Sequence, residues 1–90
     1  MNVKKVYIVG IGGAGTSALA TVYKARGFDV NGSDDGDGFY TSELQEKDIV
    51  VYDKYDSEHI TKNIDLVVHV SAIDESNVEL QKARELSLPV

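Results

Sequence analysis

The chain has 90 residues, of which 42% are hydrophobic and 27% are charged, with no cysteine and a formal net charge of −6. These values are typical of one small globular domain, exclude disulfides and thiolate metal sites, and argue against nucleic acid as a partner, because a nucleic-acid surface needs a basic patch. No apolar run approaches the roughly 20 residues that span a bilayer, and the N-terminus lacks the apolar segment of a signal peptide. We therefore expect a cytoplasmic protein with no membrane partner.

The first predicted element is a buried parallel strand over Lys4–Val9, because its residues are almost continuously apolar. The next residues include Gly10, Gly12 and Gly15, which have the G-x-G-x-x-G spacing of a nucleotide-binding turn. In such turns the first glycine lets the chain leave the strand, the second lets a phosphate approach the backbone, and the third lets the helix pack close to the strand; Gly13 adds another bare position. The sequence predicts an anion site at the helix N-terminus, and the alternative is a turn whose glycines serve packing alone.

The helix after this turn is predicted over Ala14–Arg26, with Gly27 as the residue that follows its end. Apolar residues recur within it at helical spacing and predict a stripe that faces the core. The stripe consists of Ala18, Leu19, Val22 and Ala25.

A short second strand is predicted over Phe28–Gly32, and Asp34 follows it. In dinucleotide-binding folds, an acid about 20 residues after the glycine turn accepts hydrogen bonds from a ribose, whereas the alternative for Asp34 is a local Asx turn. Residues 35–40 read Asp-Gly-Asp-Gly-Phe-Tyr and form a predicted loop. This loop departs from the calcium-loop pattern at the third ligand position, so we predict no metal site in it.

The second half of the chain continues to alternate between predicted helices and strands. In the first of these helices we expect Thr41 to cap the N-terminus and Leu44 to anchor the core. In the last helix the residues expected in the core are Val78, Leu80, Ala83 and Leu86. The predicted elements are a short helix over Thr41–Lys47, a strand over Asp48–Tyr52, a helical turn within Ser57–Ile60, a strand over Asp65–Ser71, a helix over about Asn77–Leu86, and the start of a strand at Leu88–Val90.

This alternation predicts the α/β class: a Rossmann-like, doubly wound parallel sheet of about five strands in the order 3-2-1-4-5. In such a sheet, ligands bind outside the carboxyl ends of the first and fourth strands, where the strand order reverses. Because Leu88–Val90 begins a strand that the chain does not finish, we expect the 90 residues to be one domain cut from a longer, multidomain protein.

Ser71 ends the fourth predicted strand at the same edge of the sheet as the glycine turn. Its hydroxyl and the N–H groups of Ala72 and Ile73 are candidates to face a ligand, and a simple strand-end cap is the alternative. We expect His69 to be a buried neutral histidine and His59 to lie on the surface. The chain contains no G-x-x-x-x-G-K-[ST] phosphate loop, so it has no evident ATP site.

Four motifs spread over nearly the whole chain resemble the amino-terminal domain of the Mur ligase family. Within the family, the pattern is most similar to the ligases that join L-alanine to UDP-N-acetylmuramate in peptidoglycan synthesis. The sequence departs from the family at Thr16, where methionine is usual, and at Lys54-Tyr55, where Gly-His is usual. The motifs are Val9–Ser17, Gly32–Asp34, Val70–Ile73 together with Asn77 and Glu79, and Leu88–Val90.

The resemblance implies a Rossmann-like domain that binds the UDP part of UDP-N-acetylmuramate and not NAD. It implies no catalytic residue, metal or cofactor in this chain. ATP, magnesium and the ligation chemistry would belong to a central domain, and the amino acid to a carboxy-terminal one, so the 90 residues alone are expected to be inactive. Carried over by position, the substrate contacts are Gly12, Gly13, Ala14, Gly15 and Thr16 at the diphosphate, Asp34 at the nucleoside, Tyr55 stacked on uracil, and Ser71, Ala72 and Ile73 at the diphosphate and sugar.

Two other functions share these features. A small NAD-binding module of a dehydrogenase or regulatory protein would have the same glycine turn and Asp34, although 90 residues barely provide its second mononucleotide half. An interaction domain that only keeps the fold would tolerate side chains at Gly12 and Gly13.

Overall fold

The computed structural model describes residues 4–36 and 40–90. Three residues of the predicted acidic loop, 37–39, lie outside the described residues. None of the helices in the described ranges is long and apolar enough to cross a membrane.

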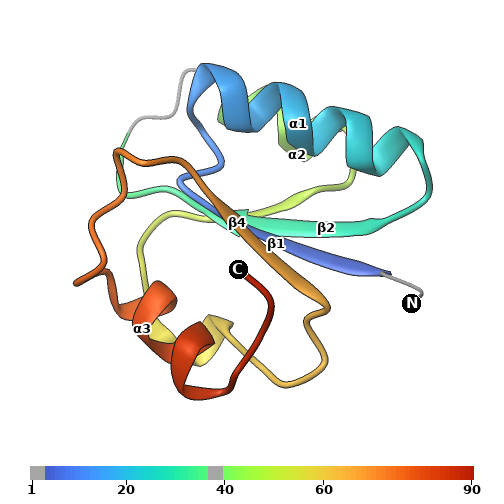
Figure 1. The fold of residues 1–90 in the computed structure, drawn as a ribbon. Coiled ribbons are helices and arrows are strands. Elements are labelled where there is room, and N and C mark those ends of the chain that lie inside the picture. Colours follow the sequence, from blue (N-terminus) through green and yellow to red (C-terminus); the bar gives the residue numbers. More distant parts are fainter. Residues whose placement is uncertain (1–3, 37–39) are drawn as a thin grey trace.

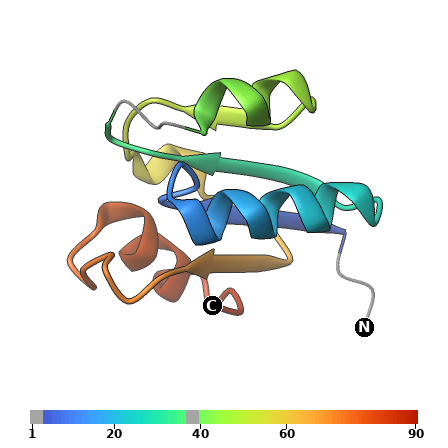
Figure 2. The same cartoon turned by 90° about the horizontal axis from the view of Figure 1, so that it is seen from above.

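Four parallel strands form one sheet in the order β3-β2-β1-β4, which confirms the predicted order for these strands (Figure 2). The predicted fifth strand is not formed within the described residues. Its residues run beside β4 instead and make one ladder-like bond there, in which the Val67 N–H donates to the Pro89 carbonyl at 2.9 Å. The strands are β1 (Lys5–Val9), β2 (Asp29–Ser33), β3 (Val50–Tyr52) and β4 (Leu66–His69).

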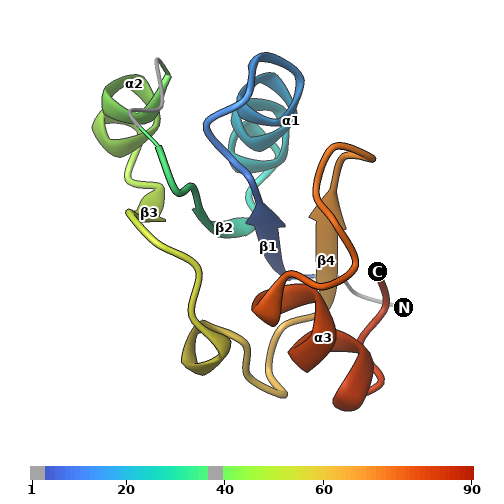
Figure 3. The same cartoon turned by 90° about the vertical axis from the view of Figure 1, so that its left-hand side faces the viewer.

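The helices cover both faces of this sheet, as expected for right-handed crossovers between parallel strands (Figures 1 and 3). Two helices, α1 and α2, lie on one face, and α3 lies on the other together with a single 3₁₀ turn, η1. The bounds are α1 (Ala14–Ala25), α2 (Thr41–Glu46), η1 (Ser57–His59) and α3 (Val78–Glu85).

The face of α1 that meets the sheet differs from the prediction. Its buried residues are Thr16, Ser17 and Ala20, which are small and let the helix approach the sheet closely. The predicted stripe is wrong: Leu19 is only half-buried, and the exposed positions are Ala18, Val22 and Ala25. Helical periodicity gives the spacing of the buried positions, but it does not give their phase when small or apolar residues occur all around the helix.

The two other helices begin differently from one another. Thr41 does not cap α2 as predicted, because Tyr40 holds the cap position and makes no side-chain cap bond; the Thr41 hydroxyl oxygen is buried with no hydrogen-bond partner among the described residues. Leu44 is buried as predicted. Helix α3 is capped by Asn77, whose Oδ1 accepts from the Glu79 N–H at 2.8 Å. Of the predicted α3 core positions, Leu80 and Ala83 are buried and Leu86 is half-buried, whereas Val78 is exposed.

Two clusters of buried side chains lie on opposite faces of the sheet, since successive strand residues point to opposite sides. The cluster under α1 and α2 contains Val6, Ile8, Ile11, Ala20, Val30, Leu44 and Ile49. The cluster under α3 and η1 contains Tyr7, Val9, Ile60, Ile64, Val67, Leu80 and Ala83.

Candidate functional site

The glycine turn after β1 is held tightly against the end of β2. The N–H groups of Gly10 and Ile11 both donate to the Ser33 carbonyl, at 2.8 and 2.9 Å. Gly10 has a φ of +79°, and a Cβ at this position would lie 2.9 Å from Ile73 Cδ1. The left-handed backbone therefore favours glycine at Gly10, whereas the contact with the end of the Ile73 side chain could be relieved by a small movement of that side chain.

The N-terminus of α1 opens toward this edge of the sheet without a side-chain cap and without an acidic residue in its first turn. The N–H groups of Ala14, Gly15 and Thr16 are the first of the helix, so they have no intrahelical acceptor, and the helix dipole places partial positive charge there. The Thr16 hydroxyl is not available to a ligand, because it donates to the Gly10 carbonyl at 2.6 Å and is buried. This end of α1 therefore offers main-chain donors to an anion.

Gly15 does not have the packing role predicted for it. A Cβ added to Gly15 would meet nothing within 4 Å. The glycine that permits close packing is Gly32 in β2, where a Cβ would lie 2.5 Å from the Ile8 carbonyl oxygen and 2.7 Å from the Ile11 side chain.

Asp34 follows β2 beside the glycine turn, at the place that the sequence predicts. One carboxylate oxygen accepts from the Gly12 N–H at 2.9 Å, and the other accepts from the Gly36 N–H at 3.0 Å. The bond from the Gly36 N–H is the local contact that an Asx turn predicts. The bond from the Gly12 N–H connects the end of β2 to the glycine turn. Because an ionised carboxylate has about four acceptor positions, a bond to a ribose hydroxyl remains chemically possible and stays a prediction.

Tyr55 and Ile73 lie next to the glycine turn, and both pack against the apolar cluster under α3. The Tyr55 hydroxyl oxygen lies 3.9 Å from the position of a Cβ on Gly10. Burial raises the pKa of Tyr55 to about 12, and the charges of Asp35, Asp34 and Glu79 add to this. The phenol therefore stays protonated at neutral pH and can donate a hydrogen bond. Its stacking on uracil stays a prediction.

The loop after β4 reaches the same edge of the sheet as the glycine turn. Ser71 and Ala72 are exposed there, and the Ile73 N–H donates to the Val70 carbonyl at 3.0 Å. His69 is the last residue of β4 and is half-buried, with Nδ1 3.0 Å from the Val70 carbonyl oxygen, so it is not the fully buried histidine that was predicted.

A buried polar network beneath the sheet was missed by the sequence analysis, which also placed His59 wrongly on the surface. Glu79 is fully buried, and its carboxylate meets Ser33 Oγ, the Tyr7 hydroxyl at 2.9 Å, the Asp56 N–H at 3.1 Å and His59 Nδ1 at 2.7 Å. The His59 side chain is only 13% exposed. A signal was present in the sequence, since Glu79 was part of the family pattern, but an acid in the first turn of a helix is also typical of an exposed position.

Aromatic rings enclose this network. The His59 ring stacks on Tyr52, with centroids 3.8 Å apart and planes 13° apart. The Tyr7 ring is a neighbour of both, with its centroid 6.5 Å from that of Tyr52 and 6.4 Å from that of His59. Burial raises the pKa of Tyr7 far above its ordinary value. Since a carboxylate accepts and does not donate, we assign the hydrogen of the His59–Glu79 contact to Nδ1.

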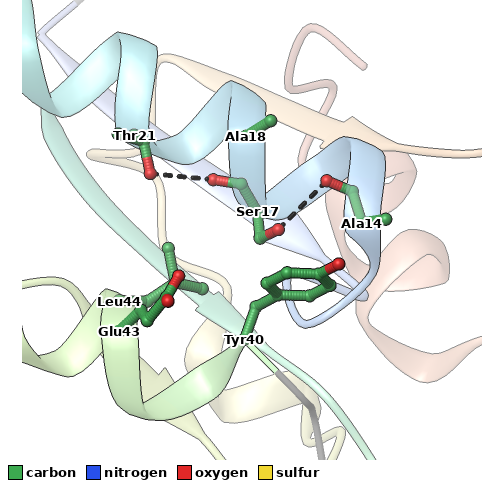
Figure 4. A pocket seen from close by; sticks show the side chains of 7 residues that line it. All are labelled: Ala14, Ser17, Ala18, Thr21, Tyr40, Glu43 and Leu44. Atoms are coloured by element: carbon green, nitrogen blue, oxygen red, sulfur yellow. Dashed lines mark hydrogen bonds between the residues drawn. The ribbon is translucent and has the colours of Figure 1, made fainter.

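A separate pocket of about 200 Å³ lies between α1 and α2 (Figure 4). The hydroxyls of Ser17 and Thr21 in its wall donate to main-chain carbonyls of α1, at 3.0 and 3.1 Å. Glu43 is the charged residue of the lining. Of the predicted site residues, the pocket touches Ala14. Its lining is Ala14, Ser17, Ala18, Thr21, Tyr40, Glu43 and Leu44. In residues 4–36 and 40–90, no three histidine or acidic residues are grouped so that they could hold a metal ion.

Residues 5–90 match the family described as "Mur ligase family, catalytic domain". The UDP-N-acetylmuramate–L-alanine ligase of Clostridium kluyveri is 45% identical over 87 residues, which is 97% of this chain and 19% of that protein. The ligase of the same name from Dictyoglomus turgidum is 38% identical over 90 residues. The chain therefore spans about a fifth of the length of these relatives.

Solved structures show the same fold. The crystal structure of the UDP-N-acetylmuramate–alanine ligase of Thermotoga maritima superposes with a TM-score of 0.89 at 32% identity, covering 94% of this chain and 20% of that one. A murein peptide ligase from Psychrobacter arcticus has a TM-score of 0.86 at 24% identity, covering 96% of this chain and 18% of that one, and supports the fold alone.

Proposed function

The chain belongs to the Mur ligase family, and we propose from this premise that it is the part of a UDP-N-acetylmuramate–L-alanine ligase that binds the UDP portion of the substrate. The relatives from Clostridium kluyveri and Dictyoglomus turgidum support this proposal, because they match nearly the whole chain and are named for that reaction. The NAD-binding alternative receives no support from these relatives.

The observation that carries the proposal is the glycine turn, which presents bare main chain at a helix N-terminus with no cap and no acid in its first turn. A diphosphate is the natural ligand for such a helix end. The Gly12 and Gly13 N–H groups already have acceptors, Asp34 and the Gly10 carbonyl. We therefore assign the phosphate oxygens to the N–H groups of Ala14, Gly15 and Thr16, and the remaining contacts to Asp34, Tyr55, Ser71, Ala72 and Ile73.

Catalysis is proposed to need parts of the ligase beyond this chain. The family resemblance assigns ATP and magnesium to a central domain, and the chain covers only 19% of the relative from Clostridium kluyveri. We expect the 90 residues alone to release no phosphate from ATP in the presence of UDP-N-acetylmuramate and L-alanine. A cytoplasmic location, where such a ligase would meet its nucleotide substrates, also stays a prediction.

The test is calorimetric titration of the chain with UDP-N-acetylmuramate, UDP and NAD. We expect both uridine ligands to bind, no more tightly than about micromolar, and NAD not to bind. Substitution Gly12→Val should abolish binding by protein that remains folded, because it places an isopropyl group in the turn that we propose the diphosphate approaches; Gly12 is buried in this turn, so folding of the variant is checked first. Ala25→Val places the same side chain at an exposed position far along α1 and should bind normally. Tighter binding of NAD than of UDP would refute the proposal.

A further inference from the structure

Glu79 touches none of the proposed ligand contacts through hydrogen bonds, yet it connects the segments that bear them. We propose that Glu79 is the positioning residue of the UDP-sugar site, whose buried carboxylate fixes the end of β2, the segment before η1 and the start of α3 relative to one another. This inference rests on the proposed function for its ligand and on the geometry of the Glu79 network for its mechanism.

The first step is the number of donors that converge on one carboxylate. Four donors reach Glu79, from β1 (Tyr7), β2 (Ser33), the segment before η1 (Asp56) and η1 itself (His59). Their residues lie between 20 and 72 positions away in the sequence. One side chain of α3 is thus bonded to β1, β2 and η1 and to the segment that precedes η1.

The second step is where these donors lie. Ser33 immediately precedes Asp34, and Asp56 immediately follows Tyr55. Asp34 accepts from the Gly12 N–H, and the Tyr55 hydroxyl lies under Gly10. Of the two segments that Glu79 holds, one therefore bonds to the glycine turn and the other lies beside it.

The third step concerns the loop after β4. This loop ends at Asn77, which caps α3 and bonds to the Glu79 N–H. Its Ile73 packs beside Tyr55 and against Gly10. Fixing the first turn of α3 through Glu79 therefore also fixes the end of the loop that bears Ser71, Ala72 and Ile73.

The energetics favour a role in geometry over a role in stability. A buried carboxylate loses its hydration, and well-packed apolar side chains commonly stabilise a core as well or better. A carboxylate with four donors instead restricts direction and distance for each of them. An apolar residue at position 79 would leave Tyr7, Ser33 and the Asp56 N–H without that acceptor.

The test compares Glu79→Gln with Glu85→Gln. The first keeps the size of the side chain but replaces one oxygen by a donor NH2 group, so the network no longer accepts from all four donors. The second makes the same change at an exposed position of the same helix. Two quantities are measured on folded protein: the Kd for UDP-N-acetylmuramate, and the amide ¹H–¹⁵N chemical shifts of Gly12, Tyr55 and Ile73 without ligand.

We expect Glu79→Gln to weaken binding about fivefold or more and to shift these amide resonances, with Glu85→Gln like wild type in both. A Glu79→Gln protein with lower thermal stability but unchanged Kd and shifts would overturn the inference, since that result is purely structural. If wild type itself does not bind, the proposed function fails, and the ligand-free shifts alone decide the positioning role. If Glu79→Gln does not fold, Ser33→Ala takes its place, and unchanged Kd and shifts there overturn the inference.

Discussion

The two faces of the sheet are held by different kinds of interaction. Under α1 and α2 a cluster of apolar side chains fills the core, and Gly32 lets β2 pack closely against Ile8 and Ile11. The buried hydroxyls of α1, on Thr16 and Ser17, bond only to nearby main-chain carbonyls. Under α3 and η1 the apolar residues surround a hydrogen-bonded network centred on Glu79. Apolar packing is not directional, whereas hydrogen bonds fix angles and distances. Apolar packing thus stabilises both faces, and only the face under α3 adds the network that we propose to align the elements of the site.

The largest expected effect tests close packing on the apolar face. Gly32→Ala should cost about 3 kcal/mol or more, or prevent folding, because its Cβ would lie 2.5 Å from the main-chain oxygen of Ile8. Gly15→Ala is the matched control, since its Cβ would meet nothing within 4 Å; it should be neutral or stabilise by up to about 1 kcal/mol. Denaturant unfolding measures both. Similar losses for the two variants would show that close packing at Gly32 does not distinguish this face.

Much of the fold was predictable because its signals are local. The apolar run before Gly10 predicts β1, the glycine spacing predicts the turn into α1, and Asn77 predicts the start of α3. The phase of α1 was not predictable, because the helix carries small residues on several faces. The fifth strand was not confirmed, since Leu88–Val90 makes only one main-chain hydrogen bond to β4 among the described residues, from the Val67 N–H to the Pro89 carbonyl.

The candidate site was predictable in position but not in detail. Asp34 lies at the expected edge of the sheet, but its bond to the Gly12 N–H depends on how β2 and the turn meet. The bond from the Thr16 hydroxyl to the Gly10 carbonyl also depends on how α1 and the turn meet. The Glu79 network joins residues up to 72 positions apart, and no periodicity or motif spacing specifies such a set. Only the three-dimensional arrangement brings them together.

A smaller effect is expected from removing one donor on the polar face. Tyr7→Phe deletes the hydroxyl that donates to Glu79 at 2.9 Å, so it should cost about 1.5–3 kcal/mol, the range for a bond to a charged group. Tyr23→Phe is the control on the apolar face, where the ring meets Phe28 edge-on and its hydroxyl has no hydrogen-bond partner in the described part of the chain. It should change the free energy of unfolding by no more than about 0.5 kcal/mol. Equal losses of unfolding free energy in Tyr7→Phe and Tyr23→Phe would mean that the hydrogen bond to Glu79 does not distinguish the two faces.

The smallest expected effect concerns a carboxylate outside the Glu79 network. Asp65 lies at the amino ends of β1 and β4, where Oδ2 accepts from the Lys5 and Lys4 N–H groups at 2.8 and 2.9 Å. These bonds, the Lys5 one first, lower the pKa of Asp65 below its ordinary value of 3.8. A pKa lowered in the folded state stabilises the protein above the unfolded pKa, and this contribution is lost as the pH falls below about 4 through the folded value.

Asp65→Asn should therefore flatten the acid limb of the curve of unfolding free energy against pH and leave its shape near neutral pH unchanged. The effect should be small, because the group is exposed to solvent and salt. The measurement is denaturant unfolding at a series of pH values, with Asp53→Asn as the control, since Asp53 is exposed and accepts no such bond among the described residues. An acid limb equally steep in Asp65→Asn and wild type would show that the bonds from the Lys4 and Lys5 N–H groups to this carboxylate add nothing to stability in acid.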